Sequence, residues 1–341
     1  MANVTQSPSV LAQKWVEIHQ KATLVDCHTD IVLELYGEID QFGMRQNFKR
    51  LGEKSVNGQV DIPRMKEGGV DCQVFAIWSD PARTYDPMRR ALELLECLTT
   101  EIEQNRSTIG LATSYGDIES LQKQGKIAAL ISLEGAEPLA GKMAMLRIFY
   151  RLGVRLLGLT WSFRNELGFG SRESTSYGLT DLGFNVVKEA NSLGVLLDVS
   201  HLNKQGFYDL AGVTSKPFIA SHSNARAVYD HRRNLDDQQI KMIADHGGAI
   251  GVVFVPMFLS DGQATLDTVC KHIMHMTKLV GSEYVGLGSD FPRRNGTPIG
   301  LEDFSKLPSL TRKLLELGLS QNDVENILGN SMLRVFKEVL K

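Results

Sequence analysis

The sequence predicts a single α/β barrel of the (β/α)8 type, in which eight parallel strands alternate with helices. Three observations predict this fold. Eight short apolar runs recur along the 341 residues, and most are separated by stretches with helical spacing. The runs are continuously apolar, as expected of parallel strands covered on both faces. No long internal repeat or low-complexity linker interrupts residues 1–341, so we expect a single domain, with residues 1–22 as an N-terminal extension.

Composition excludes several classes of protein. The hydrophobic content of 43% supports a large core, and a net charge of -3 without a long basic run gives no reason to expect nucleic acid or an anionic membrane as a partner. The four cysteines have no C-x-x-C spacing, which predicts reduced, mostly buried thiols rather than disulfides or a thiolate zinc site. They are Cys27, Cys72, Cys97 and Cys270. Without a signal peptide or an apolar stretch of membrane-spanning length, we expect a cytoplasmic protein.

The first strand is predicted in ATLVDCHTDIVLEL, where an apolar run closes on three polar residues. Alternation along a strand predicts that Asp26, His28 and Asp30 share one face, with His28 and Asp30 nearest the end. An H-x-D pair at a strand end suits zinc or a similar divalent ion. The second strand follows Gly68 and Gly69 in GGVDCQVFAIW and ends without a ligand-type residue. Helices are predicted next over residues 86–104 and 117–123.

The third strand, KIAALISLEGAEP, ends on Glu134. A buried carboxylate is costly unless a metal or a cation offsets its charge, so Glu134 is a candidate to bridge two metals. The alternative is a salt bridge to an arginine such as Arg155. After a helix containing MLRIFYRLG, the fourth strand VRLLGLTW ends at Trp161, and a glycine-rich loop through Gly183 is long enough to shape a substrate pocket.

The fifth and sixth strands, VLLDVSH and PFIASHS, end on His201 and His222, with a crossover helix predicted over residues 203–213. Both histidines would lie at the carboxyl ends of neighbouring strands, where parallel α/β proteins bind ligands. The alternative is two ordinary histidines at strand ends. Asp198 stands an odd number of positions from His201, so alternation predicts that it faces the other way and is not a ligand.

The seventh strand, GAIGVVFVP, follows a helix that Asp236 caps and Gly247 ends. A helix over residues 266–280 carries His272 and His275 on one face, which we interpret as surface or packing residues rather than a metal site.

The eighth strand, EYVGLGSD, ends on Asp290. A long loop and two helices follow, the second opened by a capping box from Ser320 to Asp323, and a final helix starts near Asn330. Six side chains are thus predicted at one rim of the barrel, where they would form a metal site. They are His28, Asp30, Glu134, His201, His222 and Asp290.

Several motifs, in this order, resemble those of the membrane dipeptidase (renal dipeptidase) family, a zinc-dependent branch of the amidohydrolase superfamily. They include LVDCHTD, GQVDIPRMKEGG, LISLEGAEP, LDVSH, IASHSNARAVYDHRRNLDD, GLGSDF and GNSMLRVF, between about residues 23 and 338. The resemblance implies a binuclear zinc centre, with His28 and Asp30 on one metal, Glu134 bridging, and His201 and His222 on the other. It also implies a homodimer.

The same resemblance gives Asp290 the role of general acid and base and gives Arg233 the role of holding the terminal carboxylate of a dipeptide. The residue types fit this chemistry. A hydroxide between two divalent ions is a nucleophile at neutral pH, Asp290 suits the proton transfer, and a guanidinium fixes a carboxylate in bidentate geometry. A structural salt bridge is the alternative for Arg233, and Arg232 and Arg226 are rivals for its role.

Two positions depart from the family pattern. Trp161 stands where renal-type enzymes carry a histidine, so its indole N–H either stabilises an oxyanion or its ring walls the pocket. Pro292 replaces a second aspartate after Asp290. The expected function is a zinc dipeptidase, tolerant of a D-residue at the C-terminal position. The alternatives are a binuclear hydrolase of another amide, such as a lactam or an N-acyl amino acid, and a catalytically silent binding barrel.

Overall fold

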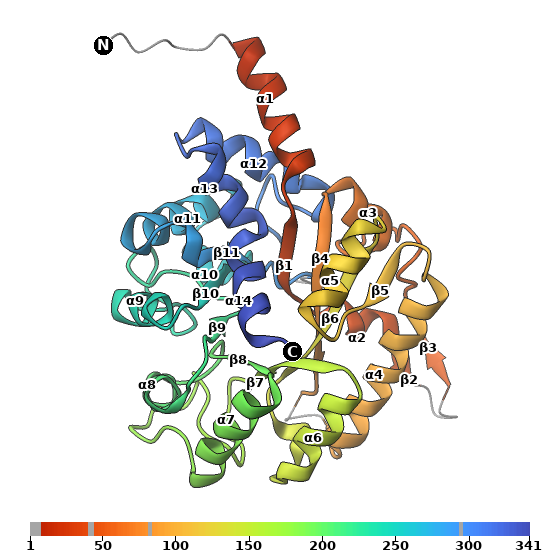
Figure 1. Cartoon of the computed structure of the whole chain (residues 1–341), viewed down its shortest axis with the longest axis vertical. Coiled ribbons are helices and arrows are strands. Elements are labelled where there is room, and N and C mark those ends of the chain that lie inside the picture. Colours follow the sequence, from red (N-terminus) through yellow and green to blue (C-terminus); the bar gives the residue numbers. More distant parts are fainter. Residues whose placement is uncertain (1–7, 40–43, 81–83, 293–295) are drawn as a thin grey trace.

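In the computed structural model, which describes residues 8–39, 44–80, 84–292 and 296–341, eight parallel strands close into a barrel surrounded by helices (Figure 1). The barrel strands, in order around the ring, are β1 (Leu24–Thr29), β4 (Val70–Trp78), β6 (Ile127–Glu134), β7 (Val154–Gly158), β8 (Leu196–Asp198), β9 (Ile219–Ala220), β10 (Ala249–Val252) and β11 (Val285–Leu287). Pairing of β1 with β11 and of β4 with β6 closes the ring. The predicted (β/α)8 barrel is therefore confirmed.

Helices cover the outside of the barrel, and most fall where helical spacing predicted them. They are α1 (Pro8–Lys21), α2 (Ile31–Tyr36), α3 (Ile62–Glu67), α4 (Pro87–Gln104), α5 (Tyr115–Lys123), α6 (Met143–Arg151), α7 (Asp181–Leu193), α8 (Lys204–Val213), α9 (Asp237–Asp245), α10 (Pro256–Leu259), α11 (Leu266–Val280), α12 (Leu307–Glu316), α13 (Gln321–Glu325) and α14 (Ser331–Val339). The predicted N-cap of Asp236 and the capping box from Ser320 to Asp323 are confirmed. None of the described helices is long and apolar enough to cross a membrane.

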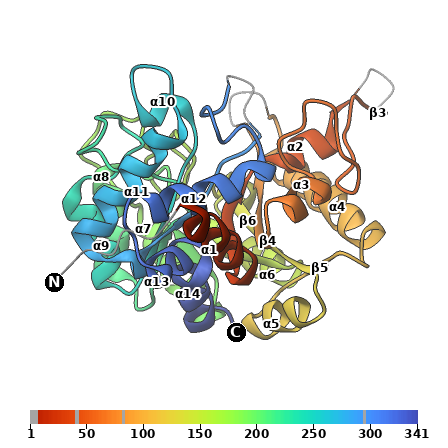
Figure 2. The same ribbon diagram turned by 90° about the horizontal axis from the view of Figure 1, so that it is seen from above.

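The apolar runs are continuous because both faces of each strand are buried. On β6, Ala128 and Leu130 pack inside the barrel, whereas Ile131 and Leu133 pack against the surrounding helices. The interior apolar cluster also includes Phe336 of helix α14. Figure 1 shows α14 over the middle of the ring, and Figure 2 shows it on the side opposite α2 and α10. Helix α14 therefore closes the amino-terminal end of the barrel.

Several of the described elements have no counterpart among the predicted ones. A short strand, β5 (Ile109–Leu111), pairs with the first residues of β6, and β2 (Glu38–Ile39) pairs with β3 (Arg45–Gln46) as a small antiparallel sheet. Helix α1 lies within the predicted N-terminal extension. It packs on α12, where His19 Nδ1 lies 2.7 Å from Thr311 Oγ1. These elements are short or amphipathic, so no strong apolar run marks them in the sequence.

Candidate metal centre

The side chains predicted at the rim meet at the carboxyl-terminal mouth of the barrel. They follow or end strands β1, β6, β8, β9 and β11. A cavity of about 880 Å³ opens there, lined by Asp30, Glu134, His201 and Asp290 together with Arg233 and Trp161. His28 and His222 are almost wholly buried beside it, with exposed fractions of 2% and 1%. Residues from five separate strands thus surround one space.

The two carboxylate oxygens of Glu134 face different groups. Its Oε1 lies 3.0 Å from His201 Nε2 and 3.7 Å from His222 Nε2, whereas its Oε2 lies 3.5 Å from His28 Nε2. The alternative salt bridge to Arg155 is not formed, because that guanidinium donates to the backbone carbonyls of residues 150 and 154 instead. Glu134 has the placement that a carboxylate needs to bridge two cations.

His28 Nε2 lies among carboxylates. It is 3.6 Å from Asp30 Oδ1 and 3.6 Å from Asp290 Oδ1, and this buried atom makes no hydrogen bond. Burial by itself lowers the pKa of His28, but the carboxylates of Glu134 and Asp30 outweigh burial and raise that pKa to about 10. So many acidic oxygens around one imidazole nitrogen favour a divalent cation, which would satisfy both the nitrogen and the carboxylates.

His201 and His222 direct their Nε2 atoms at each other, 2.9 Å apart. The Nδ1 of His201 lies 3.0 Å from Ser162 Oγ, and the Nδ1 of His222 lies 2.7 Å from Ser221 Oγ. Burial, followed by the charge of Arg233, lowers the pKa of His201 to about 3, so this imidazole is neutral near pH 7. Because the Nδ1 of each histidine contacts a serine hydroxyl, each Nε2 directs a lone pair into the space between the two rings. A cation shared by both Nε2 atoms would suit this arrangement.

Asp198 orients His222 through Ser221, a role that the sequence reasoning missed. Ser221 Oγ donates to Asp198 Oδ2 at 2.5 Å, which leaves the hydroxyl oxygen to accept from His222 Nδ1. Carboxylates commonly fix metal-binding imidazoles in this way. The prediction that Asp198 and His201 face opposite ways was wrong. Strand β8 ends at Asp198, and His201 adopts a left-handed φ of 75°, so alternation no longer applies.

Strand β1 departs from alternation as well. Val25 and Cys27 pack inside the barrel, so regular alternation would direct His28 outward. The register of β1 on β4 shifts between Asp26 and Thr29, and His28 turns into the mouth. Asp26 instead accepts from the backbone N–H groups of His28 and Ser289, which ties the ends of β1 and β11 together. The prediction of one shared face was therefore wrong for Asp26.

Asp290 and Trp161 lie on different sides of the cavity. Asp290 follows β11 with a left-handed φ of 62°, and its backbone N–H donates to the His28 carbonyl at 3.1 Å. The Trp161 ring centre lies 5.8 Å from that of His201 and 5.1 Å from that of Trp78. Trp161 therefore forms part of an aromatic wall. Pro292, the second departure from the family pattern, also lines the cavity.

Arg233 is the buried arginine of the HRRN segment. Its Nη2 donates to the His222 carbonyl at 3.1 Å, and its guanidinium carbon lies 5.6 Å from the centre of the Phe258 ring. Arg232 also lines the cavity but is exposed, whereas Arg226 does not line it and has Asp230 Oδ1 3.5 Å away. Arg233 is thus held against the cavity beside a candidate metal ligand.

His272 and His275 lie outside this centre, as the sequence predicted. His272 is fully buried, accepts from the Ala225 N–H at 3.2 Å and lies 3.2 Å from the Leu259 carbonyl. His275 Nε2 lies 2.8 Å from Asp237 Oδ1. Both are packing or surface residues.

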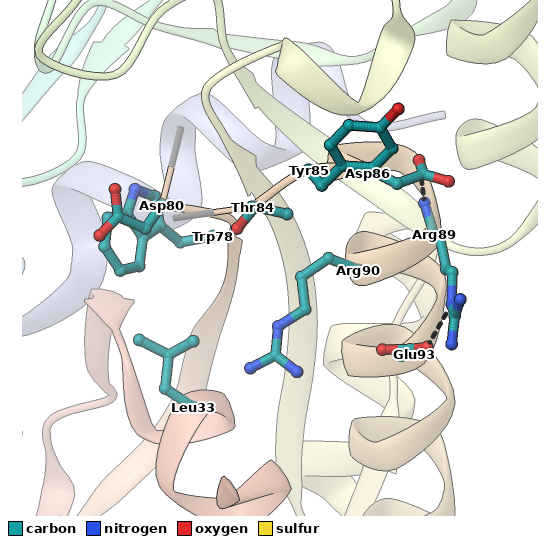
Figure 3. A pocket seen from close by; sticks show the side chains of 9 residues that line it. All are labelled: Leu33, Trp78, Asp80, Thr84, Tyr85, Asp86, Arg89, Arg90 and Glu93. Carbon is teal, nitrogen blue, oxygen red and sulfur yellow. Dashed lines mark hydrogen bonds and ion pairs between the residues drawn. The ribbon is translucent and has the colours of Figure 1, made fainter. Parts of the chain in front are cut away.

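A further cavity of about 470 Å³ adjoins the mouth. It shares Leu33, Trp78 and Asp80 with the central cavity (Figure 3). Figure 3 also shows Arg90 beside it, whose guanidinium carbon lies 3.9 Å from the centre of the Tyr36 ring. None of the candidate metal ligands lines this side cavity among the residues that the structure describes.

Comparison with known proteins identifies the family. The sequence pattern of the membrane dipeptidase family (peptidase family M19) matches residues 12–341. The chain belongs to the membrane dipeptidase family. An uncharacterized dipeptidase of Schizosaccharomyces pombe is 32% identical over 92% of this chain and 80% of its own length.

Solved structures of the membrane dipeptidase family have the same fold. Dipeptidase AC, a metallopeptidase of family M19, is 28% identical, with a TM-score of 0.85 over 94% of this chain and 99% of its own. A metallopeptidase of Rhodobacter sphaeroides, solved with a phosphinate mimic of the dipeptide L-Ala-D-Ala, is 27% identical, with a TM-score of 0.83 over 93% of this chain and 99% of its own. As a member of this family of metal-dependent peptidases, the chain is a hydrolase that acts on dipeptides.

Proposed function

We propose that this dipeptidase holds two zinc ions and hydrolyses dipeptides with a free C-terminus. His28 and Asp30 would hold one ion, His201 and His222 the other, and Glu134 would bridge them. The observation that carries this proposal is the placement of Glu134, whose Oε1 faces His201 and His222 and whose Oε2 faces His28. Imidazole and carboxylate ligands suit zinc.

The proposed roles of the other residues follow from where each of them lies in the cavity. Two bound divalent ions supply Lewis acidity and lower the pKa of water. Asp290 lines the cavity next to His28, where its carboxylate is placed to take a proton from water and pass it to the leaving amine. The buried guanidinium of Arg233 would hold the substrate carboxylate. The ring of Trp161 would form one wall of the substrate pocket, beside His201.

The charges around the mouth suit a zwitterionic substrate. Asp80 follows β4, whereas Arg232 and Arg233 follow β9, and these two strands lie four places apart in a ring of eight. The acidic side would face the amino group of a dipeptide and the basic side its carboxylate. Because the Rhodobacter sphaeroides relative was solved with a mimic of L-Ala-D-Ala, we propose that a D-residue is accepted at the C-terminal position.

The test combines metal analysis with a dipeptide panel. Purified protein should contain close to two zinc ions per chain and release amino acids from dipeptides with L- or D-residues at the C-terminal position. The matched control is each dipeptide with its C-terminus amidated, which Arg233 would bind poorly. Metal-replete protein that cleaves none of these dipeptides would contradict the proposal.

A second candidate keeps the same centre but cleaves another amide, such as a lactam or an N-acyl amino acid. Equal rates on free and amidated substrates would favour this candidate, because they would remove the need for a carboxylate clamp. The family match leaves no support for a catalytically silent barrel. The homodimer and the cytoplasmic location stay predictions, to be checked by analytical ultracentrifugation and by cell fractionation.

A further inference from the structure

A small cavity adjoins the catalytic one behind Arg233, and we name it the annex. Its volume is about 220 Å³, and its walls share Ser171, Arg232 and Arg233 with the central cavity. Pockets for whole small-molecule ligands usually measure about 300 Å³ or more. The annex therefore has room for one side chain of a substrate whose main chain lies in the central cavity.

Positive charge dominates the annex. Among the described residues that line it, the charged ones are Glu173, Lys204, Arg226, Arg232 and Arg233. Lys204 is paired with Asp236 at 2.7 Å, and Glu173 Oε1 accepts from the backbone N–H of residue 164 at 3.2 Å. Four cationic side chains and one carboxylate thus line the annex.

The neighbourhood of the annex shows the same excess of positive charge. Arg226 Nε lies 3.5 Å from Asp230 Oδ1, and the Asp230 side chain is 90% exposed. The charge of Arg226 also contributes to lowering the pKa of Asp236, the partner of Lys204. Burial, followed by the charges of Arg233, Arg232, Arg226 and Arg172, lowers the pKa of His231. His231 and Arg172 line the central cavity, whereas Arg226 lines the annex and Arg232 and Arg233 line both, so the positive charge extends from one cavity into the other and favours an anion there.

Buried polar atoms in the annex walls also lack hydrogen bonds. Ser171 Oγ, Ser223 Oγ and Asn234 Oδ1 are inaccessible and make none. Ser223 and Asn234 are only 1% and 2% exposed. Buried hydroxyls are seldom left unsatisfied, because each loses its bonds to water on folding. The guanidinium groups would donate to the oxygens of a carboxylate, and the hydroxyls of Ser171 and Ser223 would do so after their side chains rotate toward the annex, whereas Asn234 Oδ1 is an acceptor and would not.

We propose that the annex binds the side-chain carboxylate of the substrate's C-terminal residue, so that the enzyme prefers dipeptides ending in glutamate or aspartate. The inference rests on the proposed function, in which Arg233 holds the main-chain carboxylate. Because Arg233 lies in both walls, a residue anchored there by its main chain would extend its side chain toward Arg226, Ser171 and Ser223.

The test compares kcat/KM for Ala-Glu, Ala-Gln and Ala-Ala, with the C-terminal residue in L and D forms. Glutamine has nearly the shape of glutamate without its charge. We expect the wild-type protein to favour Ala-Glu over Ala-Gln by about tenfold or more, the usual effect of a charge-assisted hydrogen bond. Arg226→Gln should bring this ratio close to one, whereas Arg226→Lys should retain part of it.

Two further variants complete the test. Arg147→Gln removes an exposed arginine that pairs with Glu189 on the outer helices, and it should keep the wild-type ratio. Ser223→Ala is a conservative change that should lower the ratio even if Arg226→Gln folds poorly. Cleavage of Ala-Ala with equal rates on Ala-Glu and Ala-Gln would overturn the annex proposal alone. Failure to cleave any dipeptide would overturn the proposed function and this inference together.

Discussion

Asp290 is the carboxylate near His28 to which we assign proton transfer. Asp290→Asn keeps the size of the side chain and removes its ability to take up a proton. We expect kcat on dipeptides to fall by about 10²–10⁴-fold. Zinc content should stay unchanged, since the proposed ligands are intact, and elemental analysis alongside steady-state kinetics measures both. Activity within a few-fold of wild type would remove Asp290 from the mechanism.

We expect the chain of hydrogen bonds from Asp198 through Ser221 to His222 to affect metal binding rather than substrate binding. Asp198→Asn weakens the acceptor that orders the Ser221 hydroxyl, so His222 loses its preferred tautomer. We expect metal affinity to fall by about 10–100-fold, as measured by competition with a chromogenic chelator. Asp237→Asn, which removes an outer carboxylate paired with His275, is the matched control. Unchanged affinity in Asp198→Asn would contradict the orienting role.

At the scale of elements, helix α14 closes the end of the barrel opposite the site. Phe336 is fully buried in the interior cluster. Phe336→Ala should lower the free energy of unfolding by about 3–5 kcal/mol, because removing the ring would leave an empty space in a close-packed core. Chemical denaturation measures this loss. Glu338→Ala, on the exposed side of the same helix, should change stability by less than about 0.5 kcal/mol, and an equal loss in both variants would show that α14 is not a core element.

Helix α11 packs against the barrel through His272, and the shifted pKa of this residue makes the free energy of unfolding depend on pH. Burial lowers the pKa of His272 from 6.5 to about 4, so the unfolded state binds more protons between these values. The contribution of neutral His272 to the free energy of unfolding is complete above pH 6.5 and is lost as pH falls toward 4. We expect the free energy of unfolding of His272→Gln to fall less steeply than that of wild type over this range, as measured by urea denaturation. Parallel curves would contradict the prediction.

At the scale of the whole molecule, the proposed metal centre would join strands from around the ring. Its buried carboxylates repel one another unless a cation lies between them. Chelation should therefore lower the melting temperature by on the order of 5–10 °C, as expected when a tightly bound ligand is removed. Calorimetry with and without chelator measures the shift. Glu134→Ala, which lacks the bridging carboxylate, should show a much smaller shift, and equal shifts in both proteins would contradict a bridging role.

The eight strands and the residues at their ends were predictable because a parallel strand buried on both faces leaves a continuous apolar run. The runs ending in Glu134, His201 and His222 are clear examples. Helix caps such as Asp236 were predictable for a similar reason, since a cap is a local interaction between residues close in sequence. Short or amphipathic elements such as β5 leave no such signal.

The sequence by itself thus determined the barrel, the order of its strands and the side chains that gather at its mouth. Only the tertiary structure decided which way those side chains face. A shifted register between β1 and β4 turns His28 inward, and the left-handed backbone conformation of His201 turns its side chain toward Glu134. The tertiary structure also placed Asp198 behind His222 and formed the annex beside Arg233. Alternation and apolar runs are local properties of a chain, whereas orientation at a strand end depends on contacts between segments far apart in sequence.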